Sequence, residues 1–283
     1  MNTTTTADAA ASTFALPENL GLATVEPPPL EGRALNPVPG WMEVLREQLS
    51  SVGLAMKREA MVVAGFFGLI TAVILLQPGR SEVPLSPMAG IAAALAALLL
   101  PMVVWKGEDP ARRGYHHAMP VEHGPHAIAR GVAGWAWGLA GMTAYFAWIG
   151  LLCVATGGSV SDVEPWQWLA PFAGATVLYL FGSALTLVSS RPWKWLGLGA
   201  IGYFFLNTVF RWRTPPLVEA VNSLLSGYYG LSTVLTGLVH HEIRPPGEHW
   251  MVPDLGAWLV STMAWLAIGL TVFLWASYRQ PEK

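Results

Sequence analysis

The chain has 283 residues, of which 53% are hydrophobic and 12% are charged, and its formal net charge is −2 at pH 7. This composition is typical of a membrane protein, and nothing in the sequence resembles a basic nucleic-acid-binding patch. The single cysteine, Cys153, excludes an intrachain disulfide and is expected to be a buried, apolar-like thiol.

The first 58 residues are predicted to form a tail and a helix. Residues 1–39 are rich in Thr, Ala and Pro and lack the features of a signal peptide, so we expect a disordered cytoplasmic tail. Residues 40–58 carry apolar side chains at alternating steps of three and four, which predicts an amphipathic connecting helix on the inner membrane face. That helix is either a simple anchor or an elbow that couples a cytoplasmic partner to the first span. Its apolar positions are Met42, Leu45, Leu49, Val52 and Met56.

Six long apolar segments contain no Asp, Glu, Lys, Arg or His. Each is long enough to cross a hydrocarbon core of about 30 Å as a helix, although the fifth is near the short limit. We therefore expect an all-α integral membrane protein with a six-helix transmembrane domain over 59–278 and a cytoplasmic tail over 279–283. The absence of ionisable groups at membrane depth argues against proton or sodium coupling. The segments are 60–77, 83–105, 131–156, 166–190, 195–210 and 255–277.

The distribution of Lys and Arg predicts that both termini are cytoplasmic. With the N-terminus inside, 12 of the 16 basic residues lie on the cytoplasmic side and only Arg80, Arg211, Arg213 and Arg244 lie outside. Tryptophans at the predicted span ends are expected in the headgroup layer. They are Trp105, Trp166, Trp168, Trp193, Trp195 and Trp212.

The loop between the second and third spans is the most distinctive polar stretch. Asp109 followed by Pro110 is a good helix start, and Pro120 would end that helix after about two and a half turns. The protruding helix would present a docking surface to another protein. Its candidate contact residues are Asp109, Arg112, Arg113, Tyr115, His116, Met119 and Pro120.

Four histidines in this region raise the question of a metal site. His123 and His126 are three residues apart, but Gly124 and Pro125 between them argue against a regular helix that would aim both rings at one ion. We expect no bound metal. Haem is also disfavoured, because no span contains a histidine.

Residues 217–239 form an apolar stretch that precedes the last span. Glu219 and Asn222, with Ser226, Gly227 and Gly230, make it a poor uniform lipid-facing helix. A broken re-entrant helical hairpin is the favoured interpretation. The alternative is a seventh span, which would move the C-terminus outside.

This layout resembles the permease subunits of type-2 ATP-binding-cassette (ABC) exporters. In that family a connecting helix precedes the first span, a coupling helix joins spans two and three, and a re-entrant pair precedes span six. The closest sequence echo is AMPV at 118–121 followed by HAIARGVAG at 126–134. It is similar to the family's Leu-Pro-Val element and its basic, small-residue entry into the third span, although Met119 stands where the family often has Leu.

The resemblance implies a multi-pass permease in a bacterial cytoplasmic membrane, with its N-terminus in the cytoplasm. The chain contains no Gly-x-x-x-x-Gly-Lys-Ser/Thr element, so it is not expected to be an enzyme or to bind a cofactor. ATP and Mg would be bound by a separate ABC ATPase subunit, whose closure pushes on the coupling helix. A second copy or a related permease would complete the pathway. Gly134 and Gly138 would allow close helix packing, between subunits or within the chain.

The mild hydroxyls and many aromatics of the spans suit a hydrophobic or amphipathic cargo, but hydroxyls in a helical bundle also form simple interhelical hydrogen bonds.

Two other classes of function are alternatives to an exporter. A non-transporting membrane anchor or assembly subunit is the principal alternative to an exporter. An intramembrane enzyme is disfavoured, because the spans offer no positioned acid, base or metal ligand.

Overall fold

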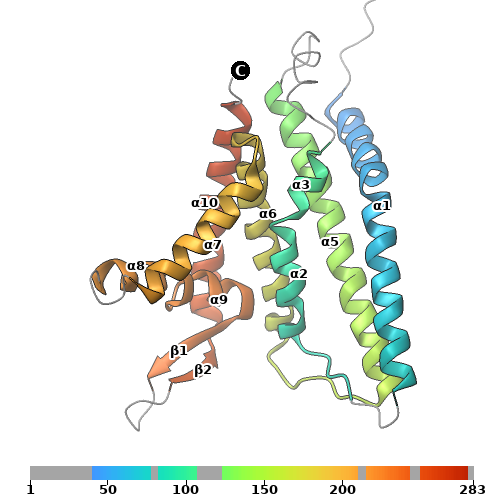
Figure 1. Ribbon diagram of the computed structural model, residues 1–283, viewed down its shortest axis with the longest axis vertical. Helices are drawn as coiled ribbons and strands as arrows, with labels where there is room; N and C mark the ends of the chain where they lie inside the picture. Colours follow the sequence, from blue (N-terminus) through green and yellow to red (C-terminus); the bar gives the residue numbers. More distant parts are fainter. Residues whose placement is uncertain (1–39, 78–81, 107–122, 210–214, 243–248, 280–283) are drawn as a thin grey trace, which may run out of the picture. The chain divides into compact units, whose positions relative to one another are not determined.

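The computed structural model describes residues 40–77, 82–106, 123–209, 215–242 and 249–279. These residues are mainly helical, and four helices are long and apolar enough to cross a membrane. They are α1 (Trp41–Leu76), α5 (His123–Thr156), α6 (Ala170–Val188) and α10 (Leu255–Tyr278), with the 3-10 helix η2 (Pro165–Leu169) leading into α6. Their length and apolar composition support the multi-pass helical membrane class predicted from the sequence, and Figure 1 shows how they are arranged. The predicted tail over 1–39 lies outside the described residues.

Helix α1 joins two elements that the sequence analysis had separated. It begins at Trp41 and continues without interruption to Leu76, through the Lys57-Arg58-Glu59 group at the expected boundary. Lys, Arg and Glu are good helix formers, and no proline interrupts the run, so the backbone has no local reason to turn there. At about 1.5 Å per residue, α1 is about 54 Å long and exceeds the thickness of a hydrocarbon core.

The second predicted span is broken in the structure. It forms the 3-10 helix η1 (Pro87–Ala89), then α2 (Gly90–Ala97) and α3 (Leu100–Val104). Pro101 has no backbone N–H to donate to the preceding turn, so α2 ends before it. Gly182 of α6 lies against the Leu98 carbonyl at the break, where an added Cβ would come within 2.3 Å of the carbonyl oxygen.

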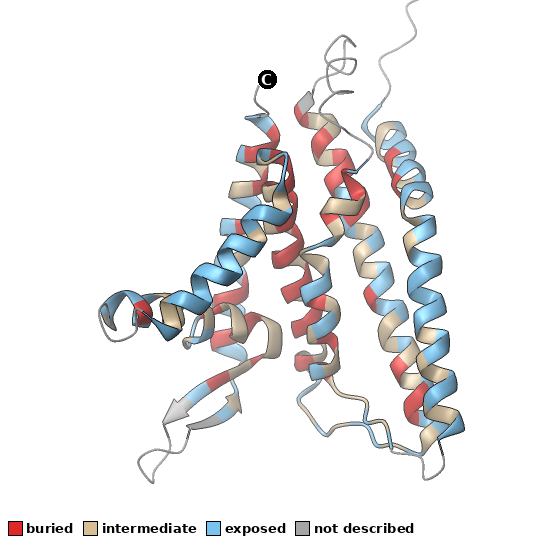
Figure 2. Cartoon of the chain, in the orientation of Figure 1, coloured by how far each residue is buried: buried red, intermediate tan, exposed pale blue. Residues whose placement is uncertain are grey.

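One hydrophobic cluster joins five helices at the end of the bundle where α3 ends and α5 begins. Helix α6 packs against α2, α3 and α10, and α1 packs against α5. Figure 2 shows that α6 is largely buried, whereas α1 and α7 are largely exposed. Removing this apolar surface from water or from loosely packed lipid favours a fixed arrangement of the five helices. The cluster comprises Val52, Val104, Trp105, Ala127, Ala133, Ala184, Leu187, Phe273 and Ala276.

The remaining elements lie between α6 and α10 in the chain. Helix α7 (Pro192–Thr208) contains no buried residue and covers most of the fifth predicted span. It is followed by α8 (Pro215–Ser226) and α9 (Leu231–Thr236), so the 217–239 stretch is interrupted at the Ser and Gly residues that had argued against a uniform helix. Whether α8 and α9 dip into a membrane as a re-entrant pair stays a prediction.

A short β-hairpin precedes α10 and was not predicted. Strands β1 (Leu238–Glu242) and β2 (His249–Pro253) pair in antiparallel register, with Val239 opposite Val252. Gly237, with a φ of 70°, ends α9 in the left-handed region and turns the chain into β1. Asp254 then starts α10, where its Oδ1 accepts a hydrogen bond of 3.0 Å from the Ala257 N–H.

Candidate functional site

The candidate site is the end of the bundle that carries the predicted coupling segment, residues 107–122. Its candidate contact residues Asp109, Arg112, Arg113, Tyr115, His116, Met119 and Pro120 all lie outside the described residues. The two flanking ends are described, at Lys106 after α3 and at His123, where α5 begins. The geometry of these ends determines what a force on the segment would move.

Arg130 fixes the end of α3 to the beginning of α5. This side chain is 8% exposed, and its Nε and Nη2 atoms donate hydrogen bonds of 3.1 and 2.7 Å to the carbonyl oxygen of Val104. The guanidinium also lies over the Trp105 ring, 5.6 Å from the centroid. We call this set of contacts among Arg130, Val104 and Trp105 the Arg130 clamp. It satisfies a helix-terminal carbonyl that has no partner within α3.

The clamp corrects two expectations from the sequence. Residue 130 precedes the third predicted span (131–156), but Arg130 lies within α5 and is buried between helices. Trp105 had been expected in the headgroup layer, but it is 3% exposed and belongs to the core cluster. A local sequence pattern could not reveal the contact between Arg130 and Trp105, because these residues are 25 positions apart in the chain.

The small residues at the beginning of α5 bring α3, α6 and α10 close to it. Added Cβ atoms at Gly131 and Gly134 would come within 2.5 Å of Phe273 Cζ and 2.3 Å of the Tyr179 hydroxyl oxygen. At Gly138 the nearest atom would be Leu100 Cδ2, at 2.9 Å. The predicted packing residues Gly134 and Gly138 therefore contact other helices of the same chain.

The apolar residues predicted for the connecting helix contact protein to different extents. Val52 is fully buried in the core cluster, and Leu49 and Met56 pack against it. Leu45 is half-buried, whereas Met42 is 72% exposed. The first part of α1 therefore shares the core from which α3 leads into the coupling segment. An ion pair of 3.8 Å between Lys106 Nζ and Glu59 Oε1 also links α1 to the residues that follow α3.

His123 and His126 lie in a regular helix, contrary to the prediction from Gly124 and Pro125. Helix α5 begins at His123, and Pro125 lies in its first turn, where a missing N–H is tolerated. Among the residues that the structure describes, no three His, Cys, Asp or Glu side chains are placed to hold a metal ion. Cys153 is buried, in agreement with its predicted role.

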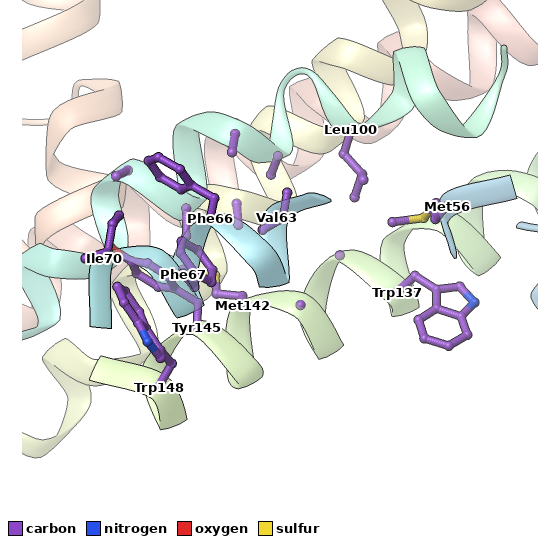
Figure 3. Close-up of a pocket in the computed structure, with 17 residues that line it drawn as sticks. Met56, Val63, Phe66, Phe67, Ile70, Leu100, Trp137, Met142, Tyr145 and Trp148 are labelled. Carbon is purple, nitrogen blue, oxygen red and sulfur yellow. The ribbon is translucent and has the colours of Figure 1, made fainter. Parts of the chain in front are cut away.

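An apolar pocket of about 520 Å³ lies between α1, α2 and α5. Figure 3 shows that Met56 and Trp137 lie at one end, and Ile70 and Trp148 at the other. The Phe67 and Trp148 rings stack with centroids 4.4 Å apart. Apart from the abundance of aromatic residues, no sequence pattern predicts this pocket, because three helices must assemble before it exists.

The polar atoms of the aromatic residues that line this pocket are hydrogen-bonded within the chain. Trp148 Nε1 donates to Thr71 Oγ1 at 2.8 Å, and Trp137 Nε1 donates to the Leu49 carbonyl at 2.9 Å. The Tyr145 hydroxyl donates to the Ala89 carbonyl at 3.2 Å. The walls are therefore fixed in place and offer a ligand mainly apolar contact.

Fold and site together define a multi-pass helical membrane protein with an apolar pocket and a tightly joined helical end. Comparisons with protein-family models, curated proteins and solved structures found no match to the chain.

Proposed function

We propose that this chain is the permease subunit of a type-2 ABC exporter, driven by a separate ATPase and carrying a hydrophobic or amphipathic cargo. The observation that supports this most is the shared core at the α3–α5 end of the bundle. Helices α1, α3, α5, α6 and α10 all contribute buried residues to that core. A push applied between Lys106 and His123 would therefore act on five helices at once.

The Arg130 clamp is the connection that would transmit this push. The coupling segment joins α3 to α5, and Arg130 holds the Val104 carbonyl against the second turn of α5. Because packed cores change between discrete arrangements rather than deforming continuously, displacement of the clamp would tilt the helices as a group. ATP and Mg would act in the partner subunit, and this chain would supply the lever and the pathway.

Helix α7 supports the expectation of a second permease subunit. A helix that is hydrophobic on all sides requires lipid or protein around it. Added Cβ atoms at Gly197, Gly199 and Gly202 would meet nothing within 4 Å in the described part of the chain. Small residues permit close approach of another helix, so this surface suits a second copy or a related permease.

The same exposed helix also suits the alternative function, a membrane anchor or assembly subunit of a larger complex. An anchor would use α7 to hold another membrane polypeptide, with no ATPase involved. The two functions differ in the polypeptide that accompanies the chain.

Purification of the tagged full chain from its native membrane in mild detergent, followed by mass spectrometry, tests the proposal. We expect a stoichiometric ATPase that carries a Walker element. Repeated recovery of the chain alone, or with redox or assembly subunits, would contradict the exporter and favour the anchor. An Arg112→Glu/Arg113→Glu double variant is the matched test of coupling, because it should insert normally yet uncouple the ATPase; normal transport by the correctly inserted variant would contradict the proposed lever.

A further inference from the structure

We propose that the pocket between α1, α2 and α5 holds one acyl chain of a membrane phospholipid, whose phosphate lies beside the Lys57 ammonium. The proposal requires only that the chain lies in a membrane, and it does not depend on an ATPase or on transport. It concerns a resident lipid that binds along the side of the bundle.

The chemistry of the walls selects a hydrocarbon. The side chains of Phe67, Ile70, Met142 and Ala93 present carbon and one thioether sulfur, and the lining indoles and phenol donate their hydrogen bonds to acceptors within the chain. A polar ligand would lose its own hydrogen bonds to water and gain none here. An alkyl chain loses none.

The length of the pocket fits one leaflet of a bilayer. On α1 the lining extends from Met56 to Ile70, a rise of about 21 Å at 1.5 Å per residue. An acyl chain in one leaflet covers about 15 Å, half of a hydrocarbon core of about 30 Å. The volume of about 520 Å³ lies within the range of small-molecule sites.

Lys57 gives one end of the pocket the charge that a phosphate requires. Gly53 packs against the Trp137 indole, where an added Cβ would come within 2.8 Å of Cζ2. Lys57 lies one turn further along the same face of α1, at the Trp137 end of the pocket. It is exposed, and among the described residues no carboxylate lies within ion-pair distance of it, whereas Lys106 is paired with Glu59. A lysine at this level extends its ammonium to the headgroup layer.

The packing of α1 explains why such a lipid would stay bound. Helix α1 packs against α5 and the short α3, and within the described residues it makes no comparably extensive contact with α2. An acyl chain between α1 and α2 would supply the missing van der Waals contacts on that side. The stacked Phe67 and Trp148 rings form a wall that is already in position before the lipid arrives.

Photo-crosslinking of the full chain in lipid vesicles tests this site. The probe is phosphatidylglycerol with a diazirine halfway along one acyl chain, present in phosphatidylcholine vesicles. We expect cross-links to concentrate on pocket residues such as Phe67 and Met142. Gly141→Leu places a side chain in the pocket, where it would displace part of the acyl chain. We expect this labelling to fall about tenfold, which corresponds to a loss of about 1.4 kcal/mol in binding free energy. Gly68→Leu is the matched control, because Gly68 lies on α1 in open space outside the pocket.

Two further variants keep the proposal falsifiable. Ala96→Leu fills the pocket from α2, so it replaces Gly141→Leu if that variant does not give monodisperse protein. Lys57→Glu should lower labelling by the phosphatidylglycerol probe several-fold and leave labelling by a diazirine-bearing free fatty alcohol unchanged. Labelling spread evenly over the exposed helix faces, or equal labelling of the filled and control variants, would overturn the site. Indifference to Lys57→Glu would overturn the phosphate contact.

Discussion

Replacement of Arg130 by Met should destabilise the protein by about 3 kcal/mol, because it removes charged hydrogen bonds and a cation–π contact from a buried position. Two donors, at 3.1 and 2.7 Å, serve one carbonyl of Val104, and that carbonyl would lose them both. A charged hydrogen bond contributes about 1.5–3 kcal/mol, and the contact with Trp105 adds about 0.5–2 kcal/mol. The total is less than the sum, because Met retains part of the packing.

The appropriate assay is unfolding by SDS in mixed micelles, followed by near-ultraviolet circular dichroism. Arg130→Lys should be intermediate, because a lysine ammonium cannot make the two-pronged contact of a guanidinium. Lys106→Met is the matched control, since it removes one positive charge next to α3 but only an exposed pair worth about 0–1 kcal/mol. Equal stability of Arg130→Met and Lys106→Met would refute the Arg130 clamp as a structural connection.

Three other changes have defined outcomes. Gly138→Asp should prevent recovery of monodisperse protein, since a charge in a span costs about 2.5–3.5 kcal/mol. The control Gly138→Ala should only shift the Leu100 side chain. Normal behaviour of the Asp variant would mean that the span is misassigned. The hydrogen bond from Tyr228 to Asp254 raises the pKa of Tyr228 above its usual value of about 10, so this link stabilises the fold below about pH 10 and is lost as pH rises through the raised pKa. Absorbance titration of tyrosinate should show this pKa fall in Asp254→Asn, and an unchanged titration would argue against the link. A Lys283→Cys variant should resist impermeant thiol reagents in intact cells, and labelling from outside would support a seventh span.

The sequence predicted the four described membrane-length helices because their signal is local, whereas the second predicted span is broken and the helix α7 in the fifth has 17 residues. A long apolar run without ionisable residues favours a helix that satisfies its own backbone in lipid, unless a residue such as Pro101 interrupts it. The sequence analysis divided the connecting helix from the first span after Arg58, whereas helix α1 continues without a break from Trp41 to Leu76. The charged residues there mark a possible change of environment and do not end the helix, so the position of the boundary stays a prediction. The break before Pro101 could have been predicted from that proline. The sequence analysis gave more weight to the apolar composition of the segment and predicted one continuous span.

The candidate site depended on information that no local pattern holds. The contact of Arg130 with Val104 and Trp105 exists because α3 and α5 pack side by side, and the pocket exists because α1 stands against α5. The β-hairpin over 238–253 was missed for a related reason. Its strands are short, and their histidines are typical of a polar loop. The pairing of Val239 with Val252 that defines the strands is visible only in the folded chain.

The central claim, that an ATPase acts on residues 107–122, is tested most directly by a cross-link from that segment. A photoreactive amino acid in place of Tyr115 would be activated in native membranes, and the captured polypeptide identified by mass spectrometry. The exporter function predicts capture of a cytoplasmic polypeptide with a Walker element. Capture of lipid or of integral membrane subunits alone, in protein that is correctly inserted, would contradict it.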